Sequence, residues 1–331
     1  MKKIRWGIIG LGNIANKFAQ AVTKMQNTEL VAVASRTKEK SEHFGNNYGV
    51  AKEKCYGTYE EIVKDNDVDV IYIAVPHSMH KELSILCLKN KKAVLCEKPV
   101  TLNEEEAVEV INCAKENETF FMEAMKTRFL PVHKEVKRMV EDGEIGEVRL
   151  IQADFGFYTE FDEKNRLFDP KLGGGALLDV GIYPISYGTW LMGGEPVDVK
   201  SNVFIGKTGV DENVSAILSY ENGREVNTYG AINLNTVREA NIVGTKGTLR
   251  VPRFSSGEKL IINMNGKEEV KEFPFAINGF EYQIEEVNTA LRNGKLDGYK
   301  DEDWGNGKLE SEIMSWNESI TVMRTLDKIK K

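Results

Sequence analysis

The stretch from residue 4 to residue 15 constrains the fold most strongly, because it joins a buried strand to a helix through a glycine turn. IRWGIIG is apolar on both faces, and GLGNIA continues from its last glycine into a helical segment. A strand that is apolar on both faces is typical of a parallel sheet covered by helices on its two sides. The strands ELVAVAS, VDVIYIAV and KAVLCEKP continue this pattern in alternation with helices. These segments predict an α/β domain with a doubly wound parallel sheet.

The glycine turn fits the pattern G-x-G-x-x-G/A, which cradles the pyrophosphate of a dinucleotide. Its first glycine, Gly10, permits the tight turn, and Gly12 lets a phosphate approach the backbone. Ala15 lets the helix pack closely, and the helix N-terminus supplies N–H groups and positive potential. We therefore predict a dinucleotide-binding Rossmann domain over residues 1–123. Its pyrophosphate contacts are expected from Gly10, Gly12, Asn13, Ile14 and Ala15.

The turn after the second strand indicates which dinucleotide binds. A site specific for NAD usually has Asp or Glu there, to hold the ribose 2′-hydroxyl. This chain has Ser35-Arg36-Thr37, with Lys40 just beyond and no acid before Glu39. A hydroxyl beside a guanidinium suits a 2′-phosphate, and Arg36 can also stack on the adenine. The turn predicts NADP rather than NAD, held by Ser35, Arg36 and Lys40; the alternative is a solvated basic turn.

Two further loops leave the carboxyl ends of predicted parallel strands, where ligands of open α/β sheets bind. In AVPHSMH (74–80), His77 and His80 have the i, i+3 spacing of metal ligands, but no further ligand of matching spacing follows, so no metal site is predicted. This loop is instead expected to lie beside the cofactor or to cap the next helix. CEKP (96–99) ends a strand with a charged pair, and the Lys98–Pro99 bond is a candidate for the cis isomer. The cofactor contacts predicted from both loops are Ala74, Pro76, His77, Glu97 and Lys98.

After about residue 124 the pattern changes to strands in which polar and apolar residues alternate. VRLIQADFGF, VSAILSY, VNTYGAINL, ANIVGT and TLRVPRF are separated by turns such as Glu221-Asn222-Gly223-Arg224. This pattern is typical of antiparallel hairpins with one face buried on helices and the other free for a partner. Residues 124–331 are therefore predicted to form an α+β domain with a large open, mostly antiparallel sheet, for substrate binding and dimerisation. Two late helices are expected, around residues 279–294 and 309–331.

GGGALLDVGIYP (173–184) opens a helix with three glycines and carries one acid and one phenol. Asp179 and Tyr183 are four residues apart, so on a helix they share one face. Arg166, shortly before the glycines, is expected to supply a polar wall and a contact to substrate or cofactor.

Composition and charge restrict the kinds of partner. The 331 residues carry 44 basic and 51 acidic side chains, a net charge of −7, without a block of like charge. This balance argues against a nucleic-acid partner. No apolar run approaches the roughly 20 residues that span a bilayer, so no membrane partner is expected. The four cysteines lack C-x-x-C spacing and are expected to be buried free thiols of a cytoplasmic protein.

The motifs together resemble a known family. GLGNIA, SRT, AVPHSMH, EKP and GGGALLDVGIYP run along the whole chain in the order found in the Gfo/Idh/MocA oxidoreductases. Within this family, EAMKTRF (123–129) and GGGALLDVGIYP resemble the branch of dimeric dihydrodiol dehydrogenases and NADP-dependent D-xylose dehydrogenases. Most of the wider family carries histidine where this chain has Tyr183, which excludes a simple copy of the inositol-dehydrogenase site.

The resemblance implies hydride transfer between the nicotinamide and a sugar, cyclic polyol or trans-dihydrodiol, in either direction. It implies that Lys98, Asp179 and Tyr183 are the catalytic residues, with the glycines passing close beneath the nicotinamide. Tyr183 then takes the alcohol proton as a phenolate favoured by Lys98, or Lys98 carries the proton itself. Asp179 orients a substrate hydroxyl or keeps Lys98 charged. Tyr282 is a substrate contact by resemblance only.

Two other functions are compatible with the resemblance. Some members of the wider group use a tightly held NAD for transient oxidation during glycoside cleavage. A yeast galactose repressor of the same architecture is a non-catalytic regulator that senses a dinucleotide. The joint presence of Lys98, Asp179 and Tyr183 favours an enzyme over the regulator. A homodimer through the sheet of the second domain is also expected, because such a surface left exposed favours aggregation.

Overall fold

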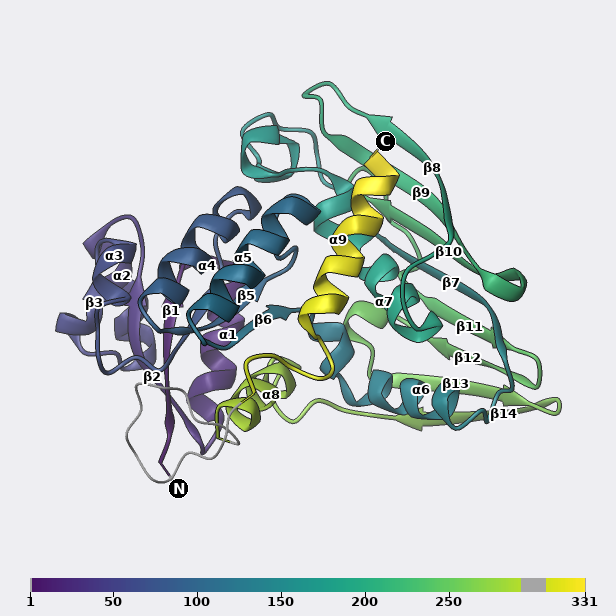
Figure 1. The fold of residues 1–331 in the computed structure, drawn as a ribbon, viewed down its shortest axis with the longest axis horizontal. Coiled ribbons are helices and arrows are strands. Elements are labelled where there is room, and N and C mark those ends of the chain that lie inside the picture. Colours follow the sequence, from purple (N-terminus) through teal and green to yellow (C-terminus); the bar gives the residue numbers. More distant parts are fainter. Residues whose placement is uncertain (1, 293–307, 331) are drawn as a thin grey trace. The chain divides into compact units, whose positions relative to one another are not determined.

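The computed structural model describes residues 2–292 and 308–330, which divide into two compact units (Figure 1). Unit 1 comprises Met1–Thr101, Glu105–Ala124 and Ala276–Trp316. Unit 2 comprises Leu102–Glu104, Met125–Phe275 and Asn317–Lys331. Each unit is built around a sheet of its own.

Unit 1 contains a six-stranded parallel sheet in the order β3-β2-β1-β4-β5-β6. The strand order reverses between β1 and β4, and open α/β sheets bind ligands at the carboxyl ends of the strands beside such a reversal. The order confirms the predicted Rossmann fold. The strands are β1 (Ile4–Ile9), β2 (Thr28–Ala34), β3 (Cys55–Tyr56), β4 (Val70–Ile73), β5 (Ala93–Glu97) and β6 (Phe121–Ala124). The helices are α1 (Asn13–Lys24), α2 (Lys38–Tyr48), α3 (Tyr59–Ile62), α4 (His80–Lys89), α5 (Glu104–Glu116) and α8 (Glu281–Arg292).

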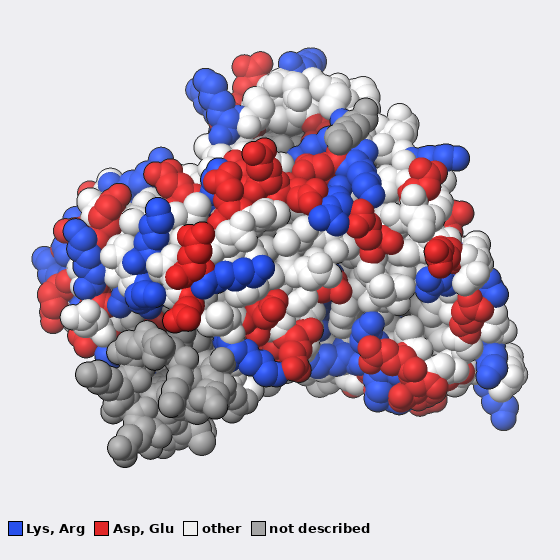
Figure 2. Space-filling view, in the orientation of Figure 1, with Lys and Arg blue, Asp and Glu red and all other residues white. Residues whose placement is uncertain are grey.

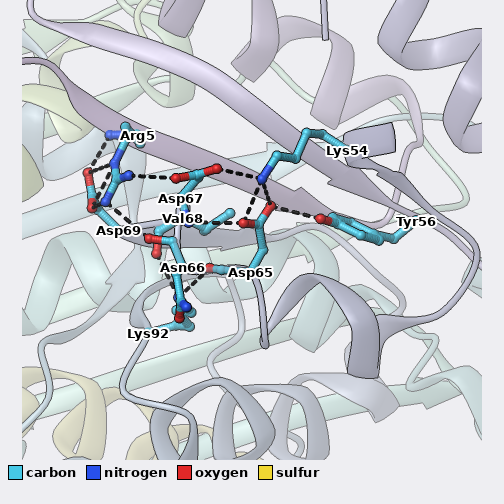
Figure 3. A network of polar contacts seen from close by, with 9 residues as sticks. All are labelled: Arg5, Lys54, Tyr56, Asp65, Asn66, Asp67, Val68, Asp69 and Lys92. Carbon is cyan, nitrogen blue, oxygen red and sulfur yellow. Dashed lines mark hydrogen bonds and ion pairs between the residues drawn. The ribbon is translucent and has the colours of Figure 1, made fainter. Parts of the chain in front are cut away.

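Ion pairs and hydrogen bonds join the segments at the amino ends of these strands (Figure 3). Arg5, near the start of β1, places Nη2 2.6 Å from Oδ1 of Asp69, which precedes β4. Lys92, just before β5, is buried, and its Nζ donates to the carbonyl oxygens of Asp65 at 2.6 Å and Val68 at 2.9 Å. The network therefore fixes the amino edge of the sheet.

Asp65 accepts hydrogen bonds from three donors of this network. Its carboxylate lies 2.8 Å from Nζ of Lys54, 2.8 Å from the hydroxyl of Tyr56 and 2.9 Å from the amide of Asp67. Burial raises the pKa of the Asp65 carboxyl, but the hydrogen bonds from Lys54, Asp67 and Tyr56 outweigh burial and lower that pKa. The hydrogen bond to Asp65 raises the pKa of Lys54 in turn. Asp65 is therefore held ionised inside unit 1.

The segment around α8 belongs to unit 1, whereas the predicted boundary places residues 124–331 in the second domain. Trp6 of β1 donates its indole N–H to Oδ1 of Asn288 at 3.3 Å. Phe18 of α1 meets Phe280 edge to face, with ring centroids 6.2 Å apart. After the last strand of the second sheet, the chain thus returns to the first sheet. The contacts that hold it there cannot be predicted from a local sequence pattern.

Unit 2 contains an eight-stranded sheet in the order β14-β13-β12-β11-β7-β10-β9-β8. Neighbouring strands are antiparallel except β7 and β10, which are parallel. This confirms the predicted α+β domain with a large, mostly antiparallel sheet. The strands are β7 (Val148–Gly156), β8 (Asp198–Ile205), β9 (Asp211–Tyr220), β10 (Arg224–Ala231), β11 (Ala240–Gly244), β12 (Gly247–Val251), β13 (Lys259–Met264) and β14 (Lys267–Glu272). The helices are α6 (Pro131–Glu141), α7 (Ile182–Met192) and α9 (Trp316–Lys330).

The two faces of this sheet differ in what covers them. Helices α6 and α7 pack against one face, and α9 lies on the same side (Figure 1). In β9, Val214, Ala216 and Leu218 are buried, whereas Ile217 is 42% exposed. The alternation in the sequence therefore corresponds to one helix-covered face and one open face, as a half-buried antiparallel sheet requires.

Helix α9 begins at Trp316, later than the predicted start near residue 309. The hydroxyl of Ser311 accepts the amides of Ile313 and Met314, and the carboxylate of Glu310 accepts the amide of Trp316 at 2.6 Å. These side chains supply the acceptors that a preceding helical turn would otherwise provide, so the helix starts after them. Strands β8, β13 and β14 lie outside the predicted strands.

Arg128 links α7 to the segment of α9 that lies in unit 2. The side chain is fully buried, and Nη1 lies 2.8 Å from Oε2 of Glu318. Its Nε and Nη2 donate to the hydroxyl and the carbonyl oxygen of Ser186, at 3.1 and 3.0 Å. A buried guanidinium needs such partners, because an unpaired buried charge is strongly destabilising. Arg128 therefore fixes the middle of α7, the helix that carries Tyr183.

Across residues 2–292 and 308–330, no helix is both long enough and apolar enough to cross a membrane. Acidic and basic side chains intermingle on the face shown in Figure 2. The four cysteines are buried and free, as predicted.

Candidate active site

The glycine turn after β1 brings two loops of unit 1 into close contact. Gly10 has a φ of +86°, and a Cβ added there would lie 2.4 Å from the carbonyl oxygen of Ala74. Both the positive φ and this close approach require glycine. Gly10 therefore lets the turn after β1 lie directly against the loop after β4, at the strand-order reversal.

The start of α1 is open to a ligand. A Cβ added at Gly12 would meet no atom within 4 Å. Gly12 is also the N-cap of α1, so no side chain caps the first amides of the helix. Asn13 and Ile14 are exposed, whereas Ala15 is fully buried against the fold. The N–H groups at this helix N-terminus fit the pyrophosphate of a dinucleotide.

In the turn after β2, some polar side chains hydrogen-bond within the turn and others are exposed to solvent. Ser35 is buried, and its hydroxyl donates to the carbonyl oxygen of Thr37 at 2.8 Å. The hydroxyl of Ser41 lies 3.1 Å from that of Ser35. Arg36 and Lys40 are exposed. Ser35 therefore shapes the turn, and the exposed cations are the groups available to a 2′-phosphate.

His80 ties the loop after β4 to the loop after β5. Its Nδ1 lies 2.6 Å from the carbonyl oxygen of Pro99, and its Nε2 lies 3.0 Å from that of Val75. Burial lowers the pKa of His80 to about 4, although both carbonyl contacts act to raise it. The ring of His77 lies 5.7 Å from that of His80, and Pro76 beside it is half-buried. Because both nitrogens of His80 face backbone carbonyls, this ring directs neither of them at a metal.

The loop after β5 carries the predicted lysine. The Lys98–Pro99 peptide bond is cis, as predicted. Glu97 accepts a hydrogen bond from the hydroxyl of Tyr72 and another from the amide of Lys98, the second at 3.3 Å. Tyr72 is fully buried and stacks on Phe18, with ring centroids 3.7 Å apart. Tyr72 thus fixes the carboxylate of Glu97, and Lys98 follows it half-buried at the carboxyl edge of the sheet.

Unit 2 brings together two residues that the sequence nominates separately. Nη1 of Arg166 lies 3.0 Å from Oδ1 of Asp179. The side chain of Asp179 is 8% exposed and that of Arg166 is 50% exposed. Asp179 is therefore a buried carboxylate paired with a guanidinium that still faces solvent.

Tyr183 lies against an aromatic side chain of the sheet. Its ring centroid is 5.3 Å from that of Phe155 on β7, and the guanidinium of Arg238 lies 5.4 Å from the Phe155 ring. Phe155 and Phe157 pack in turn on a buried apolar cluster. The cluster is formed by Leu167, Phe168, Ala176, Val180, Val210 and Ile232. Tyr183 is half-buried, so its ring is packed while the residue keeps some access to solvent.

The glycines before this helix have close neighbours within unit 2. A Cβ added at Gly174 would lie 2.6 Å from the carbonyl oxygen of Leu167. Gly175 has a φ of +111°, and a Cβ there would lie 2.3 Å from Oδ1 of Asp211. The expected passage beneath a nicotinamide stays a prediction; the contacts that demand glycine here are a carbonyl oxygen and a carboxylate.

The predicted site residues are divided between the units. Lys98 and Tyr282 belong to unit 1, whereas Asp179 and Tyr183 belong to unit 2. The hydroxyl of Tyr282 accepts the amide of Ala276 at 3.3 Å. Each unit thus contributes its own set of polar groups, one of them fitting a dinucleotide and the other carrying an acid and a phenol.

Sequence reasoning does not find Phe155 and Asp211. Phe155 belongs to an alternating strand pattern, and Asp211 stands at the polar start of another strand. Neither position carries a local signal. Only the packing of the segment Leu177–Gly181 against the sheet brings Asp211 to the glycines.

Comparison with known proteins matches both parts of the chain to models of one family. Residues 4–125 match the Gfo/Idh/MocA oxidoreductase family model with an NAD-binding Rossmann fold. Residues 133–250 match the Gfo/Idh/MocA C-terminal domain model.

Curated relatives cover nearly the whole chain. The trans-1,2-dihydrobenzene-1,2-diol dehydrogenase of Xenopus tropicalis is 36% identical over 334 residues, which cover 98% of this chain and 96% of that protein. The Homo sapiens protein of the same name is 31% identical over 345 residues, covering 99% of this chain and 96% of the relative.

Solved structures agree with the fold. An aldose-aldose oxidoreductase from Caulobacter crescentus complexed with glycerol has a TM-score of 0.87 and 25% identity, and the match covers 99% of this chain and 97% of that one. KijD10, a 3-ketoreductase from Actinomadura kijaniata in complex with NADP and TDP-benzene, has a TM-score of 0.83 with 24% identity, covering 99% and 97% of the two chains. The second likeness is one of fold.

Proposed function

The chain belongs to the Gfo/Idh/MocA oxidoreductase family, and from this membership we propose that it is an NADP-preferring dehydrogenase of sugars and cyclic diols. The proposed reaction transfers a hydride between the nicotinamide and a carbon that bears a hydroxyl group. The substrate is a sugar, a cyclic polyol or a trans-dihydrodiol, and the corresponding carbonyl compound is reduced in the reverse direction.

The substrate class rests on the position of Tyr183 beside Phe155, in a segment that also carries Asp179. A cyclic substrate can lay its apolar face against the Phe155 ring, which is 5.3 Å from that of Tyr183. We propose that its hydroxyl groups then meet the ion pair of Asp179 with Arg166. The names of the curated relatives support this choice, since they are dehydrogenases of a cyclic trans-diol.

The preference for NADP rests on the turn after β2. Arg36 and Lys40 are exposed there, and no acid occupies the position that would hold a ribose 2′-hydroxyl. A guanidinium is well suited to a phosphate, because it offers several fixed donors and keeps its charge. We propose that Arg36 binds the 2′-phosphate, with Lys40 adding positive charge nearby.

The proposed chemistry assigns the proton to Tyr183. When bound, the nicotinamide supplies the acceptor for the hydride. An isolated phenol has a pKa of about 10 and is a poor base near neutral pH. A positive charge favours the phenolate, and we propose that Lys98 supplies it and also binds the substrate oxygen. Asp179, held by Arg166, would orient a neighbouring hydroxyl.

A spectrophotometric assay tests the proposal. The purified full chain is mixed with NADP+ or NAD+ and with a panel of aldoses, cyclic polyols and trans-dihydrodiols. We expect absorbance at 340 nm to increase with at least one compound, and faster with NADP+. Glycoside cleavage without any change in added cofactor would instead identify an enzyme of transient oxidation. Tight dinucleotide binding without turnover of any compound would identify a regulator, and either outcome would overturn the proposal.

We further propose that the protein works in the cytoplasm as a homodimer. Its four buried free thiols suit a reducing compartment. The open face of the unit 2 sheet is the surface that we propose a second copy covers.

A further inference from the structure

The segment that carries Asp179 begins with an irregular helical turn. Residues Leu177–Gly181 form a π-helical turn directly before α7, and the amide of Asp179 donates to the carbonyl oxygen of Gly175 at 3.3 Å. Single π-helical turns within helices are rare and are frequent at functional sites. The orientation of Asp179 therefore depends on what anchors this irregular turn.

The carboxylate of Asp211 supplies the anchor. Leu177 donates its amide N–H to Oδ2 of Asp211. The amides of Ala176 and of Asp211 itself also favour the ionised carboxylate. Oδ1 occupies the space where a side chain at position 175 would lie, which is why Gly175 precedes the turn. One carboxylate thus satisfies amide groups at the start of the helix that would otherwise lack a partner.

Asp211 is itself held firmly by its surroundings. The residue before it, Val210, is buried in the same apolar cluster as Ala176 and Val180 of the anchored segment. The backbone carbonyl oxygen of the next residue, Glu212, accepts the amide N–H of Ile232 at 2.9 Å, which joins the start of β9 to the end of β10. A carboxylate mounted on a paired strand and packed against the helix it binds can fix that helix in one orientation.

We propose that Asp211 is a positioning residue, whose ionised carboxylate holds the π-helical turn and so orients Asp179 and Tyr183 for the reaction. The kinetic part of this inference rests on the proposed function, because it requires that these two residues act on a substrate. The structural part, that the carboxylate holds the turn, does not depend on any activity.

The charge of Asp211 makes the effect dependent on pH. Burial raises the pKa of Asp211 to about 6, against the opposite effects of its backbone amide donors and of the charge of Lys330 on α9. The other ionisable groups of the adjoining segments are Glu212 on the same strand and Asp179 in the turn itself. Protonation below about pH 6 removes the charge that binds the amides, so the orientation of Asp179 should loosen there.

Activity and stability should respond to this titration in opposite directions. The pKa of Asp211 in the folded protein lies above the value of about 3.9 expected in an unfolded chain. The folded state therefore binds more protons between these two values, and the free energy of unfolding falls as pH rises through that range. Activity should rise over the same range, because the ionised carboxylate is the form that holds the turn.

The experiment compares the Asp211→Asn variant with the Asp198→Asn variant, a control at an exposed acid on the neighbouring strand. Asparagine keeps the shape of the side chain but removes the charge and one acceptor oxygen. We expect kcat to fall at least about tenfold at pH 7, the effect of losing a charge-assisted hydrogen bond, with the Kd for NADP unchanged. The rise of activity near pH 6 should disappear, while the melting temperature at pH 7 stays the same or increases. The control should match the unmodified protein in all four measurements.

Two further measurements separate this inference from the proposed function. Hydrogen exchange of residues 173–181 should quicken in Asp211→Asn at pH 7, and in the unmodified protein it should quicken as pH falls through about 6, after correction for intrinsic rates. These results are independent of turnover, so a chain without activity on any compound would overturn the proposed function alone. Asp211→Glu, which keeps the charge, should restore the pH dependence of exchange and decides the question if the asparagine variant does not fold. Unchanged exchange and an unchanged pH profile in Asp211→Asn would overturn the positioning role, as would a loss of kcat explained wholly by a lower melting temperature.

Discussion

At the scale of single residues, one residue of the turn after β2 stabilises the turn and its neighbour is exposed for binding. Ser35 is buried and bonded to Thr37, whereas Arg36 is exposed. We expect Arg36→Ala to weaken NADP binding by about 1.5 to 3 kcal/mol, because a charge-assisted hydrogen bond is lost, and to leave NAD binding nearly unchanged. Isothermal titration calorimetry with both dinucleotides measures the difference. Lys24→Ala, at an exposed cation ending α1, is the control. Equal affinity of the unmodified protein for NAD and NADP would contradict the prediction.

The second prediction at this scale concerns the proton. Tyr183→Phe keeps the ring that packs against Phe155 and removes only the hydroxyl. We expect kcat to fall by about 10² to 10⁴, the usual worth of a positioned general acid or base, with the Kd for NADP little changed. Tyr220→Phe is the matched control, because its hydroxyl donates to the carbonyl oxygen of Gly194 and has no proposed role in the reaction. Full activity of Tyr183→Phe would show that Tyr183 does not carry the proton and would favour Lys98 in that role.

Lys98→Met tests whether the two residues act as a unit. We expect it to be at least as damaging as Tyr183→Phe, since it removes both a charge and a substrate contact. The losses in the double variant should be strongly non-additive, because residues that share one step fail together. Oxidation should also rise with pH through the apparent pKa of the coupled pair, and Tyr183→Phe should abolish that rise. A double variant whose losses simply add would show that Tyr183 and Lys98 act independently.

The sequence and the structure agree on some of these residues for a physical reason. Asp179 could be nominated as the one acid in an apolar stretch after three glycines, and Arg166 as a cation shortly before them; the structure joins the two at 3.0 Å. Asp211 could not be nominated, since it reaches Leu177 only after strand β9 has packed beneath the helix. Side chains that act through long-range packing leave no local spacing to recognise.

At the scale of elements, the network at the amino edge of the first sheet gives a prediction about stability. Asp65→Asn removes the charge that binds Lys54 and weakens the bond to Tyr56 (Figure 3). We expect the free energy of unfolding at pH 7 to fall by about 2 to 3 kcal/mol, because the Asp65 side chain is buried while Lys54 is partly exposed. Urea unfolding measures this loss. Asp67→Asn, in the same network but with a side chain 58% exposed, should change stability much less.

The stability that Asp65 contributes depends on pH, and the sign of this dependence follows from the lowered pKa of the Asp65 carboxyl. Hydrogen bonds lower the pKa of Asp65 below its value in the unfolded chain, where it is about 3.9. Its ionised form therefore stabilises the fold fully above that value and progressively less as pH falls through the lowered pKa. Unfolding curves of Asp65→Asn and the unmodified protein should converge as pH falls through the lowered pKa of Asp65. A difference that persists undiminished there would show that Asp65 acts through shape rather than charge.

Elements could be predicted where their signal is local. Residues that are apolar on both faces indicate the parallel strands. The turn at Asn222 and Gly223 indicates the hairpin of β9 and β10. The return of α8 to unit 1 could not be predicted, because it depends on contacts such as Trp6 with Asn288, far apart in the chain. The π-helical turn at Leu177–Gly181 could not be predicted either, since it is anchored by a carboxylate from another strand.

At the scale of the whole molecule, the open face of the unit 2 sheet is the surface that a second copy can cover. Ile217, Asn227, Gln152 and Asn241 lie in one cross-strand row on this face. Within the described ranges, Oδ1 of Asn227 is shielded from solvent yet has no hydrogen-bond partner. The amides of this row and the exposed Ile217 beside them are suited to pairing with a second copy, because amides can both donate and accept.

Light scattering coupled to size exclusion tests the proposed homodimer. We expect a mass of twice the 37.3 kDa of one chain at micromolar concentration. Ile217→Lys should shift the mass toward one chain, because it places a charge in the proposed contact surface without disturbing the helix-covered face. Val197→Lys, at a residue 65% exposed and outside the strands, should leave the dimer intact. A stable mass of one chain for the unmodified protein would contradict the dimer. An unchanged mass for Ile217→Lys would place the contact on another surface.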